Sequence, residues 1–102
     1  MKTGIVDADL LAAYRGVHAC VGCGQWRATA PHHLIRRSEL RLDIHDNLLA
    51  LCFTCHRKAH DNPRFEDEIV FRCKSLPALS RLAEYHRSKR LLRWIDALIS
   101  RN

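Results

Sequence analysis

Two Cys-x-x-Cys pairs constrain the fold of this chain more than any other feature of its sequence. They consist of Cys20, Cys23, Cys52 and Cys55. Two intervening residues let both sulfurs of a pair reach one ion, and four thiolates satisfy a tetrahedral Zn²⁺. Such a site is coordinatively closed, so we expect a structural zinc whose binding energy is largely folding energy. The alternative is a set of buried cysteines without a ligand.

The compartment expected for the chain also favours metal over disulfides. The 102 residues include five cysteines, an odd number, and residues 1–7 lack the apolar stretch of a signal peptide. No apolar run approaches the roughly 20 residues that cross a membrane. We therefore expect a cytoplasmic protein, and reducing conditions favour metal binding by paired cysteines. A core of this size buries limited apolar surface, so a zinc ion would help to stabilise it.

The pattern of apolar residues and helix breakers predicts a strand, loop, strand and helix around the cysteine pairs. The expected elements are a helix over 8–15 capped by Asp7, strands over 30–35 and 48–52, and a helix from about 54 to 60. Asn62-Pro63 starts another helix, Pro77 interrupts it, and residues 78–100 are helical with room for a break near Ser88. We expect an α+β fold, with a core over 1–62 and a helical extension over 63–102.

A second group of residues has the spacing of a metal site. His32 and His33 are adjacent on an expected strand, so their side chains point to opposite faces. His56 and His60 are four residues apart on an expected helix, which puts both imidazoles on one face. His32, His56 and His60 can therefore share one ion, and His33 stays available as a base. Taken singly, each of these histidines is more often a packing or surface residue.

These motifs together resemble the HNH, or ββα-metal, nucleases. Three segments carry the similarity. Residues 30–38 have two histidines at the end of a strand, residues 46–52 form an Asn-Leu strand, and residues 52–60 form a cysteine knuckle that continues into a helix. The resemblance covers residues 18–61, and the final His-x-x-x-His also resembles the colicin nuclease domains, which lack the cysteines. It implies a metal-dependent endonuclease that hydrolyses DNA phosphodiester bonds and leaves 5′-phosphate and 3′-hydroxyl ends.

The resemblance also implies a role for each residue that matches the motif. His33 would be the general base, and Asn47 would tie down the loop and orient His33. The ligands of a single catalytic ion (Mg²⁺, Mn²⁺, Ni²⁺ or Zn²⁺) would be His32, where many family members have Asp, together with His56 and His60. Residues 39–43 depart from the family pattern, because they stand where a Gly-Gly pair is typical.

The net charge of +6 is compatible with a polyanionic partner such as DNA. The loop arginines Arg36, Arg37 and Arg41 are candidates for phosphate contact, because the loop lies beside the expected chemistry. Residues 74–102 carry seven basic and two acidic residues, either for DNA-backbone contact or as a solvated helix face. We expect His18, His45 and His86 to be structural or solvated. Cys73, Trp26 and Trp94 are expected to pack in the core.

The apolar stripe of the last helix must be buried. Leu91, Leu92, Ile95 and Leu98 follow helical spacing, so the extension either folds back on the core or pairs with a second copy as a homodimer. Two alternatives to a free nuclease remain open. One is a zinc-stapled DNA-binding module without turnover, and the other is an accessory protein of a phage or mobile element that needs a partner for activity.

Overall fold

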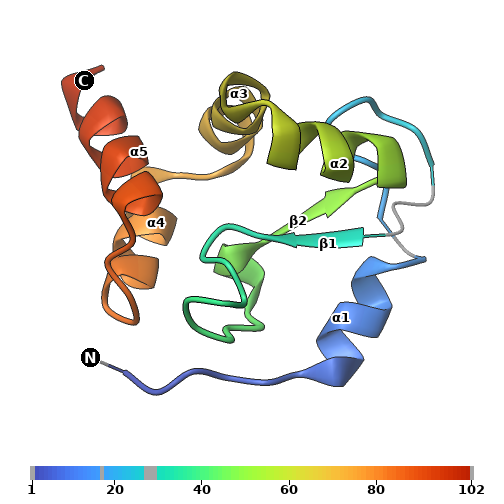
Figure 1. Cartoon of the computed structure of the whole chain (residues 1–102), viewed down its shortest axis with the longest axis horizontal. Helices are drawn as coiled ribbons and strands as arrows, with labels where there is room; N and C mark the ends of the chain where they lie inside the picture. The colour runs from blue at the N-terminus through green and yellow to red at the C-terminus, as the bar shows by residue number, and fades with distance from the viewer. Residues whose placement is uncertain (1, 17, 27–29, 102) are drawn as a thin grey trace.

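The computed structural model describes residues 2–16, 18–26 and 30–101. The elements in these residues are α1 (Ala8–Tyr14), β1 (Ala30–His33), the 3₁₀ turn η1 (His45–Asn47), β2 (Leu48–Leu51), α2 (Phe53–Asp61), α3 (Pro63–Cys73), α4 (Leu76–Ala83) and α5 (Lys89–Ser100). Figure 1 shows the small sheet between α2 above and α1 below, with α4 and α5 at one end of the molecule. The α+β fold expected from the sequence is confirmed. None of the helices in the described residues combines the length and the hydropathy of a membrane span.

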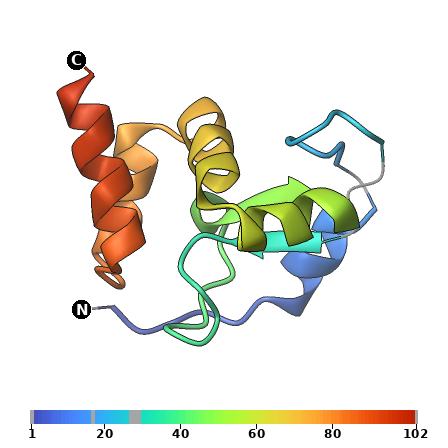
Figure 2. The same cartoon turned by 45° about the horizontal axis from the view of Figure 1, so that its top comes forward.

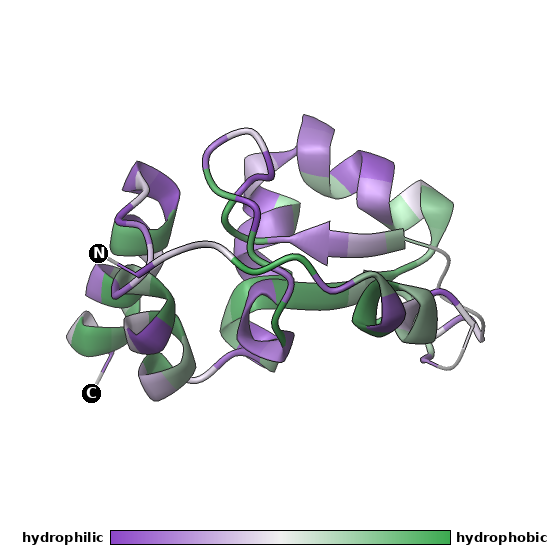
Figure 3. Ribbon diagram, turned by 90° about the horizontal axis from the view of Figure 1, so that it is seen from below, coloured by the Kyte–Doolittle hydropathy of each residue, from purple (hydrophilic) through white to green (hydrophobic). Residues whose placement is uncertain are grey.

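The sheet places its two histidines on opposite faces. Strands β1 and β2 pair antiparallel, with His32 opposite Leu49 and His33 opposite Leu48. Residues paired across an antiparallel sheet share a face, so His32 lies on the face of Leu49, and His33 on the face of Leu48. In Figure 3 the ribbon of β1 is largely hydrophilic in colour and that of β2 is hydrophobic.

Helix α1 covers one face of this sheet. Leu11 and Tyr14 form a small hydrophobic cluster with Leu48 and Ala50 of β2. The helix begins where expected, because the Asp7 side chain accepts a hydrogen bond from the Leu10 amide. Capping by Asp7 satisfies a backbone N–H that would otherwise lack a partner in the first turn. The face of the sheet that carries His33 therefore abuts α1.

The other face of the sheet forms the main core together with the C-terminal helices. This cluster joins Leu49 and Leu51 of β2 to side chains of α3, α4 and α5, which are Ile69, Val70, Leu79, Leu82, Leu91 and Trp94. Figure 2 shows α4 and α5 side by side, with α3 between them and the sheet. Leu91 of the apolar stripe of α5 is thus buried within the chain itself, and Ile95 and Leu98 are partly buried against the same cluster. Ile99 remains 55% exposed.

The helix boundaries follow capping residues that the sequence contains. Ser75 and Ser88 cap α4 and α5 by accepting from the amides three residues later, so the break near Ser88 is confirmed. Pro77 lies in the first turn of α4, where its missing N–H costs nothing. The interruption therefore falls just before Pro77, at residues 74–75.

Two expectations about packing are wrong. Cys73 is exposed, because it is the last residue of α3 and lies outside both hydrophobic clusters. Trp26 is 66% exposed, because it follows the first cysteine pair in a loop outside both hydrophobic clusters. Trp94, in contrast, is fully buried as expected.

Asp67 joins α3 to α5, and its replacement by Asn is expected to destabilise the fold. The carboxylate accepts from the indole Nε1 of buried Trp94 at 2.7 Å and from both terminal nitrogens of Arg93 at 2.9 Å. Asp67→Asn should therefore lower the free energy of unfolding by about 1–3 kcal/mol in urea titrations at neutral pH. Asp61→Asn, on an exposed residue, is the matched control and should change it little.

The same contacts predict how the difference in free energy of unfolding between wild type and Asp67→Asn depends on pH. Burial alone would raise the pKa of Asp67, but the hydrogen bonds from Arg93 and Trp94 outweigh it and lower the pKa. A depressed folded-state pKa stabilises the protein above the unfolded value of about 3.9. The difference between wild type and Asp67→Asn should therefore shrink as the pH falls below about 4. Equal stability at neutral pH would show that Asp67 does not join the helices.

Candidate metal centre and active site

The four paired cysteines form one cluster. Cys20, Cys23, Cys52 and Cys55 place their sulfurs within 4.8 Å of one another, and the Cys23 and Cys52 sulfurs are 3.9 Å apart. Four sulfurs about 2.3 Å from a tetrahedral Zn²⁺ would be about 3.8 Å from each other. The cluster therefore fits a zinc ion, and four thiolates would leave it without an open position.

Backbone amides and one glycine shape this cluster. The amides of Gly22 and Cys55 point at the sulfurs of Cys20 and Cys52 at 3.3 and 3.4 Å. A Cβ added at Gly22 would lie only 3.0 Å from the Cys55 sulfur, so glycine leaves room for the first pair to approach the second closely. Cys52 is also the N-cap of α2. The second cysteine pair and α2 thus form a single unit.

Helix α2 and strand β1 bring three histidines together. His32, His56 and His60 each offer one ring nitrogen within 4.8 Å of the others, and the Nδ1 atoms of His32 and His56 are 3.2 Å apart. Imidazole nitrogens bind zinc at about 2.1 Å, so these atoms are close enough to reach one ion. Three imidazoles would leave coordination positions for phosphate and water. The set expected from the sequence spacing is assembled.

The surroundings favour the neutral form of the two α2 imidazoles. Burial and the neighbouring His32 and His60 lower the pKa of His56 to about 4. Burial and the nearby Arg36 guanidinium likewise lower the pKa of His60, and Arg36 donates a hydrogen bond to Nδ1 of His60. A neutral imidazole is the form that binds a metal.

On the other face of the sheet, a carboxylate holds His33. The ring Nε2 of His33 lies 2.8 Å from Oδ1 of Asp43. Burial lowers the pKa of His33, while the hydrogen bond and charge of Asp43 oppose this effect. Because a carboxylate can only accept, Nε2 carries the proton and Nδ1 keeps its lone pair. His33 is therefore arranged as a proton acceptor.

Asp43 itself is fixed by three donors. Besides His33, it accepts from the Arg41 guanidinium at 3.0 Å and from the backbone amide of Asp7 at 2.9 Å. Burial alone would raise its pKa, but the hydrogen bonds from Arg41, the Asp7 amide and His33 outweigh it and lower the pKa to about 2. Arg41, expected at DNA phosphate, thus forms an ion pair within the loop.

Asn47 closes the loop that carries Asp43. Its side chain is fully buried, accepts from the amide of Ile35 at 2.7 Å and donates to the carbonyl of Leu42 at 2.8 Å. The two ends of the loop are therefore joined, and the residue before Asp43 is held in place. The contact from Asn47 to the His33 side chain is thus indirect, through the loop and Asp43.

This arrangement corresponds to a known protein family. Residues 20–62 match the model of a family described as HNH endonuclease. The segment is an HNH domain. The matched region contains the four cysteines, the three clustered histidines, His33 and Asn47, which confirms the resemblance drawn from the motifs. Helix α1 and helices α3 to α5 lie outside it. A search of curated proteins and a search of solved structures each gave no match.

A basic cleft of about 310 Å³ opens beside the HNH histidines. Its lining combines three histidines and three arginines with three apolar residues of α1 and β1, and the full set is Leu11, Arg15, Ala30, Pro31, His33, Arg36, Arg37, His56 and His60. Among the residues that the structure describes, no carboxylate lines it, so the cleft attracts anions. Arg15, at the end of α1, is a member that the sequence did not single out.

Other charged side chains of the extension are used within the chain. Arg81 pairs with Asp46, and Arg93 pairs with Asp67. His45 lies 2.8 Å from the Tyr14 hydroxyl, and His86 lies 3.1 Å from Glu39, in agreement with structural roles. Three of the seven basic residues of 74–102, Arg81, Arg90 and Arg93, therefore belong to ion pairs, whereas Arg87 and Lys89 are exposed.

The HNH domain also depends on residues that sequence reasoning missed. Asp43 stands in the segment that replaces the glycine pair of the family, so the departure from the pattern was its signal. Glu66 of α3, whose Oε2 is 2.6 Å from Nε2 of His32, gave no signal, because a single Glu on an amphipathic helix is typical of a solvated residue.

Proposed function

We propose that this protein is a metal-dependent endonuclease that hydrolyses DNA phosphodiester bonds at its HNH site. The observation that carries this proposal is the shared cleft. His33, with an available Nδ1, lines the same basic cleft as His56 and His60, two of the three clustered histidines. A base, a metal site and positive charge thus converge where a phosphate would bind. A reducing cytoplasm would keep the four thiols available to zinc.

The chemistry of hydrolysis assigns a role to each group. His33 accepts a proton through Nδ1 from the attacking water, whose oxygen bonds to phosphorus while the bond to the 3′ oxygen breaks. Asp43 keeps the His33 ring oriented and stabilises the imidazolium that forms. A divalent ion held by His32, His56 and His60 would supply charge neutralisation at the phosphate and the leaving oxygen. The leaving 3′ oxygen takes a proton from solvent, so the ends are 5′-phosphate and 3′-hydroxyl.

The arginines of the cleft support a polyanionic substrate. Arg36 and Arg37 follow β1, and Arg15, the C-cap residue of α1, lines the same cleft. We assign Arg15 and Arg37 to phosphate contacts, which give affinity without sequence recognition, and Arg36 to a phosphate contact that replaces its hydrogen bond to His60. Arg41 serves Asp43 first, because its guanidinium is already engaged with that carboxylate.

Supercoiled plasmid provides the test of this function. The zinc-loaded protein is incubated with plasmid and Mg²⁺, Mn²⁺, Ni²⁺ or Zn²⁺, and in parallel with EDTA. We expect nicking or linearisation in at least one metal, none with EDTA, and loss of cutting in His56→Ala but not in His18→Ala. Binding without cutting in every metal would favour a non-catalytic DNA-binding module. Activity only after adding a phage or mobile-element protein would favour an accessory protein, and sedimentation of the active species would reveal a homodimer.

Replacement of Arg37 is expected to weaken DNA binding in a salt-dependent way. The residue is exposed and lines the cleft, so Arg37→Ala should remove one phosphate contact. Binding to duplexes of unrelated sequence should weaken to a similar extent, and the slope of log affinity against log salt should fall by about one. Fluorescence anisotropy at several salt concentrations measures both. Arg57→Ala, on an exposed arginine that does not line the cleft, is the control, and an equal effect in both variants would contradict the assignment.

A further inference from the structure

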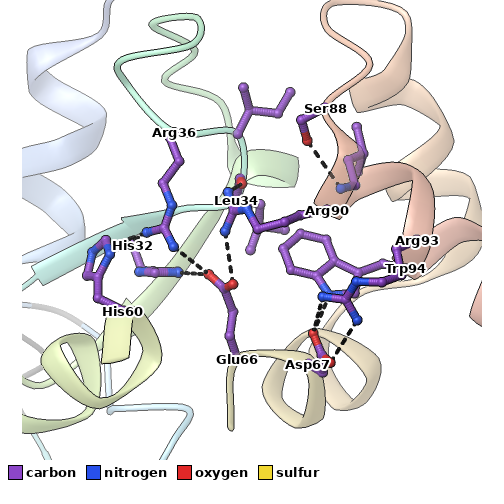
Figure 4. Close-up of polar contacts among 12 residues, drawn as sticks. His32, Leu34, Arg36, His60, Glu66, Asp67, Ser88, Arg90, Arg93 and Trp94 are labelled. Atoms are coloured by element: carbon purple, nitrogen blue, oxygen red, sulfur yellow. Dashed lines mark hydrogen bonds and ion pairs between the residues drawn. The ribbon is translucent and has the colours of Figure 1, made fainter. Parts of the chain in front are cut away.

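Glu66 is a buried carboxylate that lies outside the HNH segment. It belongs to α3, and only 3% of its side chain is exposed. Both of its oxygens are used, because Oε2 lies 2.6 Å from Nε2 of His32 and Oε1 accepts from the Arg90 guanidinium at 2.9 Å. Figure 4 shows Glu66 between the histidines on one side and Arg90 on the other. A buried charge is retained at a cost unless its partners compensate it, so this placement calls for a reason.

Arg90 connects Glu66 to the strand that carries the histidines. This α5 residue also donates to the carbonyl of Leu34 at 2.6 Å, and Leu34 directly follows His33. One guanidinium therefore joins α5, α3 and the end of β1 (Figure 4). The position of the Glu66 carboxylate is thus fixed relative to the strand, rather than only relative to its own helix.

The hydrogen bond between Glu66 and His32 decides which nitrogen of His32 can bind a metal ion. With Nε2 donating to Glu66, the lone pair of His32 is on Nδ1, and Nδ1 is the atom that lies 3.2 Å from Nδ1 of His56. Carboxylates that accept from the second nitrogen of a metal-binding imidazole fix its tautomer and orientation. Glu66 accepts from Nε2 of His32 in the same way.

We propose that Glu66 and Arg90 are positioning residues of the three-histidine metal site, so that helices α3 and α5 complete a site whose ligands all lie in the HNH segment. Glu66 holds His32 in the tautomer that presents Nδ1 to the ion, and Arg90 holds Glu66. Because this inference rests on the proposed function, it is tested by metal binding and by tautomer state as well as by cleavage.

The test begins with the wild-type protein, which carries zinc in the cysteine cluster and no other metal. Long-range ¹H–¹⁵N spectra of the imidazoles report which nitrogen of His32 is protonated. We expect the Nε2–H tautomer, and the Nδ1–H tautomer would overturn the proposal. This measurement needs no variant, so it holds even if a substitution prevents folding.

Calorimetric titration with Ni²⁺ then compares variants. Glu66→Gln is expected to bind Ni²⁺ about 10–100-fold more weakly than wild type, and Arg90→Gln, which leaves Glu66 in place, should give a smaller loss. Glu68→Gln, on an exposed residue of the same helix, should match wild type. Wild-type affinity in a folded Glu66→Gln would overturn the proposal, whether or not the protein cuts DNA.

The two proposals can fail separately. If wild type binds Ni²⁺, Glu66→Gln weakens that binding and no metal supports cleavage, the positioning role stands and the nuclease function fails. If wild type cuts DNA and Glu66→Gln both binds Ni²⁺ and cuts as wild type does, the nuclease function stands and the positioning role fails.

Discussion

Removal of zinc from the four-cysteine cluster is expected to unfold the chain. Cys20, Cys52 and Cys55 belong to the main hydrophobic core, and Cys52 also caps α2. The apparent free energy of zinc binding to such sites is about 10–16 kcal/mol, which equals or exceeds the total stability of about 5–15 kcal/mol of an ordinary domain. Circular dichroism and the fluorescence of buried Trp94, recorded during chelation and again after zinc is restored, should show reversible unfolding.

Cysteine variants separate this effect from a general loss of thiols. Cys55→Ser should prevent folding or leave a chain that binds no zinc at the cluster. Cys73→Ser, at the exposed cysteine outside the cluster, should fold and bind zinc as wild type does. A chelated protein that keeps its native spectrum and its melting temperature would show that the core is stable without the ion.

Replacement of His33 by Ala is expected to slow DNA cleavage by about 10²–10⁴-fold, the usual contribution of a general base. His33 lies on the sheet face opposite His32 and outside the three-histidine cluster. The variant should therefore fold and should bind the catalytic metal as wild type does. Single-turnover rates on a defined duplex, at saturating metal and enzyme, isolate the chemical step from DNA binding.

Asp43→Asn should also slow DNA cleavage, but by a smaller factor than His33→Ala does. An amide oxygen can still accept from Nε2 of His33, but it lacks the charge that stabilises the imidazolium formed during proton transfer. The rate should fall without a change in metal affinity, whereas His18→Ala should cut at the wild-type rate. A cleavage rate in Asp43→Asn equal to that of wild type would remove Asp43 from the mechanism.

Short-range spacing explains what the sequence could predict. Two Cys-x-x-Cys turns, two histidines one helical turn apart and two adjacent histidines on a strand each fix a local geometry. The ends of α2 and α5 follow from capping and proline rules that act within a few residues. The metal clusters were therefore within reach once the strand, loop, strand and helix order was recognised.

The residues that hold the histidines were beyond such reasoning. Asp43 meets His33 across 10 residues, Glu66 meets His32 across 34, and Arg90 meets Leu34 across 56. These contacts depend on how the helices pack on the sheet, which no local pattern encodes. The exposure of Cys73 was missed for a related reason, since helical periodicity shows which face is apolar but not where that face leaves the core.

The most direct measurement compares Ni²⁺ affinity and single-turnover cleavage in the same preparations of wild type, His33→Ala and His56→Ala, each loaded with zinc and assayed in the metal that supports cutting. If the base and the metal ligands are different residues, His33→Ala binds Ni²⁺ as wild type does and cuts DNA at least about 100-fold more slowly. His56→Ala then loses metal affinity and cleavage activity together. Cutting by His33→Ala at the wild-type rate, or a wild type that binds Ni²⁺ and cuts no DNA in any metal, would contradict the account.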